Sequence, residues 1–248
     1  MATNVEGVGS PTRATGRGYM ADQEFFVRYA VALAVFILFG FAQFAARGYS
    51  NFQTAPAIVH LHGGLMVGWL GIFIAQNLLV HKGQLALHRK LGWFSAVLVA
   101  VIAVTGVQVG VEAVAAGRQP PFFSPPYFLV LTAVGSLVFA AMVLWGITLR
   151  RTVQWHRRAM LGAMFILLEP AFGRLLPMPL LGAWGETVVL GFQLLFVWIL
   201  ARHDRKVRGE VHPATIAVGA FVVVSHVLVE VIARLPQMES LAAAVAAG

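Results

Sequence analysis

Long apolar stretches follow one another along most of the chain, and the polar and charged positions are gathered between them. Each stretch has about 20 residues, which suffices for an α-helix to cross the hydrocarbon core of a bilayer. We therefore predict an all-α integral membrane bundle of seven transmembrane helices. The predicted helices lie near Phe25–Ala45, Ala57–Val80, Leu91–Ala115, Tyr127–Leu149, Ala159–Leu176, Leu180–Leu200 and Ala214–Ile232.

The composition indicates the same class. Hydrophobic residues make up 59% of the 248 positions and charged residues 11%, and the mean hydropathy of +0.79 lies outside the range of soluble globular domains. The first apolar stretch is too long for a signal-peptide core and no small-residue cleavage site follows it, so we expect it to be retained. The chain has no cysteine, which excludes disulfides, thiolate ligands and thiol nucleophiles. We expect an integral protein of the bacterial inner membrane, in contact with the lipid bilayer.

Positive charge is concentrated in alternate loops between the predicted helices. The formal net charge is +8. The basic residues after the second, fourth and sixth predicted helices are Lys82, Arg89 and Lys90; Arg150, Arg151, Arg157 and Arg158; and Arg202, Arg205, Lys206 and Arg208. The positive-inside rule places such loops in the cytoplasm, so the N-terminus is expected in the cytoplasm and the C-terminus outside. This distribution indicates membrane topology, and we expect no nucleic-acid partner.

Three regions follow from these patterns. Residues 1–24 are rich in Gly, Ser, Thr and Arg and are predicted to form a disordered cytoplasmic tail. Residues 25–235 form the predicted transmembrane domain, and residues 236–248 a flexible C-terminal tail. Because no soluble domain of useful length is present, any chemistry is expected within the helices or their short loops.

Ionisable side chains interrupt the outer halves of five predicted helices. They are His60, His62, Glu112, Glu169, Glu186, His226 and Glu230. Ionisable groups within membrane helices usually face the bundle interior and carry function. Imidazole and carboxylate together suit iron, copper or zinc, and bundles build such sites from facing helices. We therefore predict a buried His/Glu site, with a structural polar network without metal as the alternative.

The local sequence ranks these candidates. His60 and His62 are about 200° apart on a helix, so one of them is expected to face the site, and His62 is the better candidate. Pro170 follows Glu169 directly, and its missing N–H frees backbone carbonyls, which predicts a polar pocket beside Glu169. Glu112 and Glu186 are open to a second interpretation as solvated interfacial residues.

Two further histidines begin predicted helices in matching contexts, His88-Arg89-Lys90 and His156-Arg157-Arg158. Imidazoles from two helices can ligate a haem iron axially, and Arg89 and Arg157 are the candidate partners of its propionates. The alternative is contact with lipid headgroups at the cytoplasmic surface. His81, His203 and His212 are assigned to that surface.

A local resemblance supports the haem hypothesis. The segment His62-Gly63-Gly64-Leu65-Met66, followed by Trp69 and by His88-Arg89, resembles transmembrane b-type cytochromes of the ascorbate-reducible kind over about 50 residues. The resemblance implies that His62 and His88 are axial ligands of haem b. The chain departs from that family because its fourth helix has no histidine, which leaves His156 and His226 as the partners.

Two more resemblances concern larger parts of the chain. From His60 to Leu176 the sequence resembles a bacterial family of polytopic membrane proteins known only as a domain of unknown function. The match rests on Gln76, the His88 and His156 segments, and Arg174-Leu175. By analogy only, ligands on helices two, three and seven are also similar to seven-helix ceramidase-like zinc hydrolases.

Three functions are compatible with these residues. The first is a redox or electron-transfer protein with haem b or a divalent metal, acting with a quinone, a lipid-like substrate or a redox partner protein. The second is a metal-dependent hydrolase in which Glu169 or Glu230 is the general base. The third is a proton-coupled transporter that uses the same carboxylates without a metal.

Overall fold

The computed structural model describes residues 22–248, and the predicted tail at residues 1–24 lies almost entirely outside them. Within residues 22–248 the protein is all-α and has no strand. The helices are α1 (Gln23–Ala46), α2 (Ala57–His81), α3 (Leu85–Ala115), α4 (Pro125–Thr148), α5 (Val153–Ile166), α6 (Leu168–Leu175), α7 (Met178–Leu181), the 3-10 turn η1 (Gly182–Trp184), α8 (Gly185–Arg208), α9 (Pro213–Ala233) and α10 (Pro236–Ala247).

Six segments of the described chain are long and apolar enough to cross a membrane, judged by length and composition. They are α1, α2, α3, α4, the segment Met178–Arg208 and α9. These segments indicate an integral membrane protein, as expected. The predicted span Ala159–Leu176 is not among them, because the chain there is divided into α5, with 14 residues, and α6, with 8 residues. The described residues therefore give six candidate spans by this measure, and the seventh expected transmembrane helix stays a prediction.

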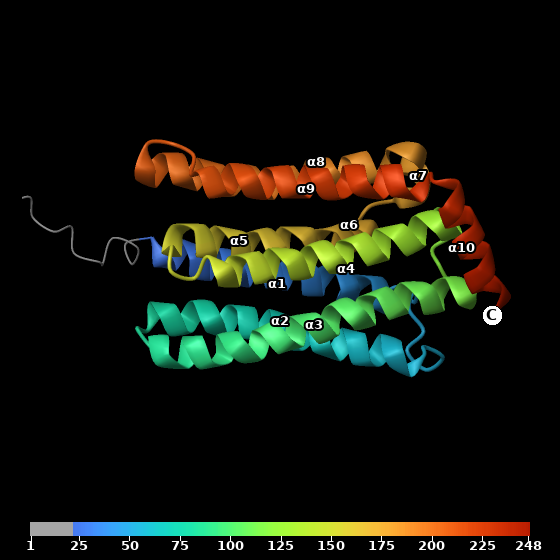
Figure 1. Cartoon of the computed structure of the whole chain (residues 1–248), viewed down its shortest axis with the longest axis horizontal. Coiled ribbons are helices and arrows are strands. Elements are labelled where there is room, and N and C mark those ends of the chain that lie inside the picture. Colours follow the sequence, from blue (N-terminus) through green and yellow to red (C-terminus); the bar gives the residue numbers. More distant parts are fainter. Residues whose placement is uncertain (1–21) are drawn as a thin grey trace, which may run out of the picture.

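Pro170 accounts for the division between α5 and α6. A proline has no N–H to donate to the carbonyl four residues earlier, which is that of Ile166, and its ring crowds that carbonyl. α5 ends at Ile166 and α6 begins at Leu168, so the break lies where this missing hydrogen bond would be. α6 follows α5 end to end, and the two helices together extend along the long axis of the bundle (Figure 1).

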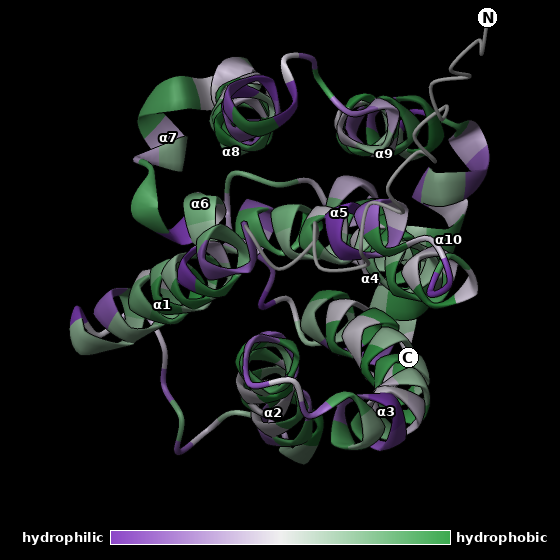
Figure 2. Cartoon of the chain, turned by 90° about the vertical axis from the view of Figure 1, so that its left-hand side faces the viewer, coloured by the Kyte–Doolittle hydropathy of each residue, from purple (hydrophilic) through white to green (hydrophobic). Residues whose placement is uncertain are grey.

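The helices form three layers when the bundle is viewed from one end (Figure 2). α8 and α9 lie in one outer layer, α2 and α3 lie in the other, and α1, α6, α5 and α4 lie between them. The packing agrees, because α4 contacts α3, α5 and α9 and thus joins all three layers. Three of the four outer helices are the least buried: 17% of the apolar window of α2, 28% of that of α9 and 33% of that of Met178–Arg208 are buried, against 39% for α1, α3 and α4. Apolar side chains remain on those outer faces, where lipid is expected to cover them.

α5 lies in the middle layer and begins earlier than predicted. The hydropathy pattern placed its start at Ala159 and assigned the preceding arginines to a loop, whereas α5 begins at Val153 and includes two of them, Arg157 and Arg158. Arg158 is fully buried because Asp204 of α8 is buried beside it, and the carboxylate neutralises the guanidinium. A buried charge is tolerated when it is paired and hydrogen-bonded. Hydropathy alone underestimates the length of such a helix.

The three basic loops lie at the same end of the molecule. The α2–α3, α4–α5 and α8–α9 connections meet at one end, and the α1–α2 and α3–α4 connections lie at the other (Figure 1). This arrangement is the one that alternate basic loops require. The assignment of the basic end to the cytoplasm stays a prediction.

The C-terminal segment 236–248 differs from the predicted flexible tail, since α10 occupies Pro236–Ala247. Proline at the first helical position and a run of alanines both favour a helix. α10 packs across the ends of α3 and α4, where Ala242 is 3% exposed beside Val114 and Leu129. Those contacts order a segment whose composition alone indicated a loose end.

Candidate functional site

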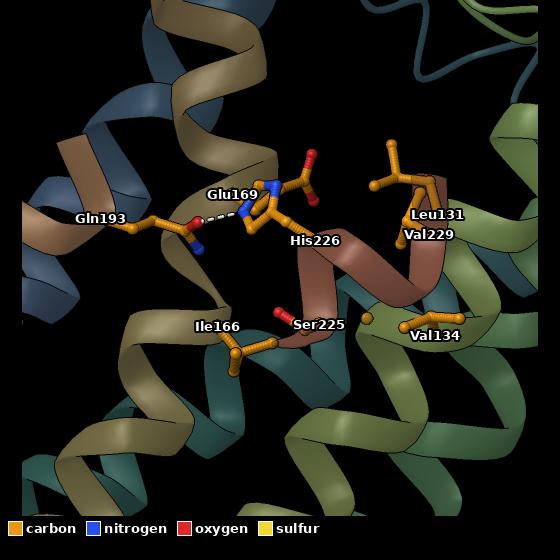
Figure 3. Close-up of a pocket in the computed structure, with 9 residues that line it drawn as sticks. Leu131, Val134, Ile166, Glu169, Gln193, Ser225, His226 and Val229 are labelled. Carbon is orange, nitrogen blue, oxygen red and sulfur yellow. Dashed lines mark hydrogen bonds between the residues drawn. The ribbon is translucent and has the colours of Figure 1, made fainter. Parts of the chain in front are cut away.

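Part of the predicted outer cluster comes together around a small cavity. The cavity, about 20 Å³, is lined by Glu169 of α6, Gln193 of α8, and Ser225 and His226 of α9, with apolar side chains of α4 and α5 closing it. Figure 3 shows Glu169 and His226 beside one another, with Gln193 reaching toward the imidazole. This volume is about that of one water-sized probe. The polar pocket predicted beside Glu169 is therefore present, but it is small.

A chain of hydrogen bonds fixes the orientation of His226. The amide Nε2 of Gln193 donates to the carbonyl oxygen of Phe165 at 2.8 Å, so its Oε1 faces the other way. That oxygen lies 2.6 Å from Nε2 of His226 (Figure 3). Because an amide oxygen only accepts, Nε2 of His226 carries the proton and donates. Phe165 precedes the break at Pro170, so this carbonyl is bound by a side chain where the helix is interrupted.

Glu186 is the least satisfied carboxylate of the cluster. The residue is 9% exposed, and neither carboxylate oxygen has a hydrogen-bond partner among the described residues. Nδ1 of His226 lies 4.0 Å from Oε2 of Glu186. Glu169 and Glu230 are close enough to act on Glu186 electrostatically. Glu186, which the sequence left open as an interfacial residue, is thus buried inside the cluster.

Glu230 lies on the more exposed side of the same cluster. Tyr127 of α4 donates a hydrogen bond of 2.8 Å to Oε1 of Glu230, and Arg234 pairs with Oε2. The Glu230 side chain is 37% exposed and that of Arg234 is 77% exposed. Arg174 is the electrostatic partner of Glu169 and also donates to the Pro170 carbonyl. Glu230 therefore has an ion-pair partner and Glu169 an arginine within electrostatic range, whereas Glu186 pairs with no arginine within residues 22–248.

The remaining outer candidates lie elsewhere. His62 is held between α2 and α3, where its Nδ1 lies 3.0 Å from the hydroxyl of Thr105. His60 is exposed on α2, and Glu112 pairs with Arg118 at 3.0 Å with both side chains more than 40% exposed. His62 and His226 belong to opposite outer layers of the bundle (Figure 2). No group of three or more His, Asp or Glu side chains able to hold a metal ion occurs within residues 22–248.

The two helix-opening histidines are brought together at the basic end. The imidazole rings of His88 on α3 and His156 on α5 have centroids 6.2 Å apart and planes at 89°. Nδ1 of His156 lies 2.7 Å from the Gly146 carbonyl, so Nδ1 is the donor and Nε2 keeps its lone pair. Nδ1 of His88 is buried and has no hydrogen-bond partner in the described part of the chain. Gln76 Oε1 and Trp69 Nε1, on the facing α2, are buried without one as well.

The arginines predicted to accompany these histidines differ from each other. Arg89 is exposed beside His88. Arg157 instead makes two hydrogen bonds of 2.7 Å to the carboxylate of Asp22 and stacks 4.0 Å above the ring of Phe26. Arg157 is therefore engaged in a structural contact between α5 and the start of α1, and Arg89 is the residue left to meet an anionic group near His88.

Sequence reasoning missed the ionic contacts that tie this end of the bundle together. Asp204, within a run of charges after the sixth predicted span, is fully buried and accepts from Arg158, from the hydroxyl of Thr215 and from the backbone N–H of His212. His203, assigned to the surface, stacks on Phe25 with ring centroids 3.6 Å apart. The lone aspartate among basic residues was the available signal.

Asp22 and His212, at the starts of α1 and α9, both have pKa values shifted by the charged groups and the burial at the basic end of the bundle. Burial alone would raise the pKa of Asp22, but its hydrogen bonds and ion pairs with Arg157 and His203 outweigh burial and lower it. Burial lowers the pKa of His212, and the nearby charges of Arg158 and Arg208 add to that effect. Asp22 is therefore held as the carboxylate, and His212 is held neutral as the cap of α9.

Comparison of the chain with protein-family models, with curated proteins and with solved structures finds no match.

Proposed function

We propose that the protein is a membrane redox protein that binds haem b between His88 and His156 and passes electrons at the basic end of the bundle. The observation that carries this proposal is the pairing of these two rings, from separate helices, at a centroid distance of 6.2 Å. Imidazoles bound to one metal through bonds of about 2.0–2.1 Å have ring centres roughly 6 Å apart. The observed spacing fits two axial ligands.

The number of protein ligands favours haem over a bare metal ion. Zinc and copper sites need three or four side-chain ligands. A haem iron already has the four porphyrin nitrogens, so two imidazoles complete its coordination. Since residues 22–248 hold no cluster of three such ligands, the inner pair suits haem better than the outer cluster suits zinc. For this reason we do not propose the metal-dependent hydrolase.

The surroundings of the pair support the same assignment. A ligand imidazole usually donates its second ring nitrogen to a carbonyl, which fixes the tautomer, and His156 does so to Gly146. The buried Nδ1 of His88 has no hydrogen-bond partner among the described residues, and it is an atom that a bound iron would satisfy. When bound, a haem supplies one-electron chemistry, while the protein orients the imidazoles and Arg89 offers a cation to a propionate.

An optical spectrum of the purified protein tests this proposal. The full chain, produced in haem-replete cells, is expected to show a Soret band that shifts on reduction. His88→Ala and His156→Ala are each expected to lose it. His81→Ala, an exposed histidine at the same end of the bundle, is the matched control and is expected to keep it. A colourless wild-type preparation that also fails to bind added haemin refutes the proposal.

A further inference from the structure

The hydrogen bonds of the outer cluster determine which nitrogen of His226 carries a proton, and this in turn constrains the protonation of Glu186. His226 uses the N–H of its Nε2 to donate to Gln193, whose own orientation is set by its bond to the Phe165 carbonyl. A neutral His226 therefore turns the lone pair of Nδ1 toward Glu186, 4.0 Å away. If Glu186 were ionised, its carboxylate would be a second acceptor facing the lone pair of His226 Nδ1. One proton, on Glu186 or on His226 Nδ1, removes the repulsion between these two acceptors.

The neighbours of Glu186 decide where this proton resides. The titratable groups that act on it come from three helices: Tyr127 of α4, Glu169 of α6, and His226 and Glu230 of α9; Arg174 and Arg234 stand next to Glu169 and Glu230 in turn. Arg234 forms an ion pair with Glu230, whereas Arg174 acts on Glu169 electrostatically and donates its hydrogen bond to the Pro170 carbonyl. A third negative charge on Glu186 would face two carboxylates with no arginine of its own. Like charges disfavour ionisation, and so does removal of a carboxylate from water.

We infer that Glu186 is a proton-binding site, protonated at neutral pH, that exchanges its proton with the aqueous phase at the end of the bundle opposite the basic loops. A neutral acid facing the lone pair of Nδ1 of His226 across 4.0 Å places no second negative group opposite it, so the two groups coexist without a buried charge. This assignment rests on the 9% exposure and unpartnered oxygens of Glu186 and on the fixed orientation of His226.

A route to water follows from the placement of Glu230. Its side chain is 37% exposed, it pairs with the still more exposed Arg234, and Tyr127 donates to it. Glu230 therefore meets bulk water and is within electrostatic range of Glu186. The cavity lined by Glu169 and His226 has room for about one water molecule, so a water there could connect these two side chains of the cluster. Chains of carboxylate and imidazole groups in membrane helices carry protons in this manner.

Infrared difference spectroscopy of the full chain in lipid membranes tests the inference, because a protonated carboxylic acid has a carbonyl stretch distinct from that of a carboxylate. The wild-type protein at neutral pH is expected to show this band, with a shift in D₂O that reports exchange. Glu186→Gln is expected to abolish the band. Glu112→Gln, which removes a glutamate at the same end that pairs with exposed Arg118, is the matched control and is expected to leave it unchanged.

The outcomes separate the possibilities without reference to haem. Absence of the band from the wild type overturns the inference, as does its persistence in Glu186→Gln. If Glu186→Gln does not fold, Glu169→Gln and Glu230→Gln serve instead: both are expected to keep the band, and its loss in either one places the proton elsewhere and overturns the assignment. Glu230→Gln is further expected to slow the D₂O shift. An unchanged exchange rate refutes the route through Glu230.

Discussion

The buried ion pair between Arg158 and Asp204 gives a stability prediction that can be worked from the contacts. Both side chains are 0% exposed. Asp204→Ala removes the partner of a buried guanidinium, which costs about 3–5 kcal/mol when the other charge stays behind. The substitution also strands the donors of Thr215 and His212, which adds on the order of 1 kcal/mol each if they find no water. We therefore expect a loss at or above the upper end of that range.

The assay is reversible unfolding of the purified protein in detergent micelles, followed by helical circular dichroism. Arg158→Met leaves the Asp204 carboxylate without its guanidinium and is expected to be destabilised by a similar amount. The double variant Arg158→Met with Asp204→Leu buries no unpaired charge. It is expected to be more stable than either single variant, because the penalty of a single deletion comes mainly from the charge that remains.

A matched surface pair defines the baseline. Arg28 and Glu24 form an ion pair on α1 with side chains 77% and 65% exposed. Arg28→Met is expected to change stability by less than about 1 kcal/mol, since exposed ion pairs contribute little. If Asp204→Ala is no more destabilising than Arg28→Met, or if the double variant is as unstable as the sum of the single ones, the pair does not couple α5 to α8 as described.

Two further predictions concern the packing of α1. Because the folded-state pKa of Asp22 is lowered, its contribution is complete above its usual value of 3.8 and is lost as the pH falls through the folded pKa. The difference in unfolding free energy between wild type and Asp22→Asn is therefore expected to be about 1.5–3 kcal/mol near neutral pH, because the variant loses the charged hydrogen bonds to Arg157. This difference is expected to shrink only in that acid range. A difference that grows on acidification contradicts the prediction. A Cβ on Gly40 would stand 3.1 Å from the backbone oxygen of Ala171, so Gly40→Val is expected to lower stability by about 1–3 kcal/mol, whereas Gly63→Val, with nothing within 4 Å, is expected to unfold as the wild type does in the same assay.

One part of the outer cluster was predictable because its signal is local. Pro170 beside Glu169 predicted a pocket there, and a small cavity lined by Glu169 is present. The role of Gln193 was not predictable. A glutamine in an apolar span gives no sign of its partners, and only the packing of α8 against α5 and α9 places it between the Phe165 carbonyl and His226.

The grouping of the candidate ligands also depended on packing. His62 and His226 have similar depths in their helices, but their helices belong to opposite outer layers, so depth alone overstated their proximity (Figure 2). His88 and His156 were paired by a repeated local motif, and the structure places their rings 6.2 Å apart. Arg157 was assigned to a propionate because nothing in its own segment indicates that Asp22 lies against it.

The amino-acid sequence by itself determined that the chain forms apolar helices and which loops are basic, because a backbone in lipid must satisfy its hydrogen bonds within each helix and loop charge controls the direction of insertion. Only the tertiary structure decided which polar side chains meet. A buried charge can persist wherever an opposite charge faces it, and that partner comes from another part of the chain: Asp204 for Arg158 and Asp22 for Arg157. Which face of each helix is turned to which neighbour is a property of packing in the whole bundle, and no single segment of the sequence contains it.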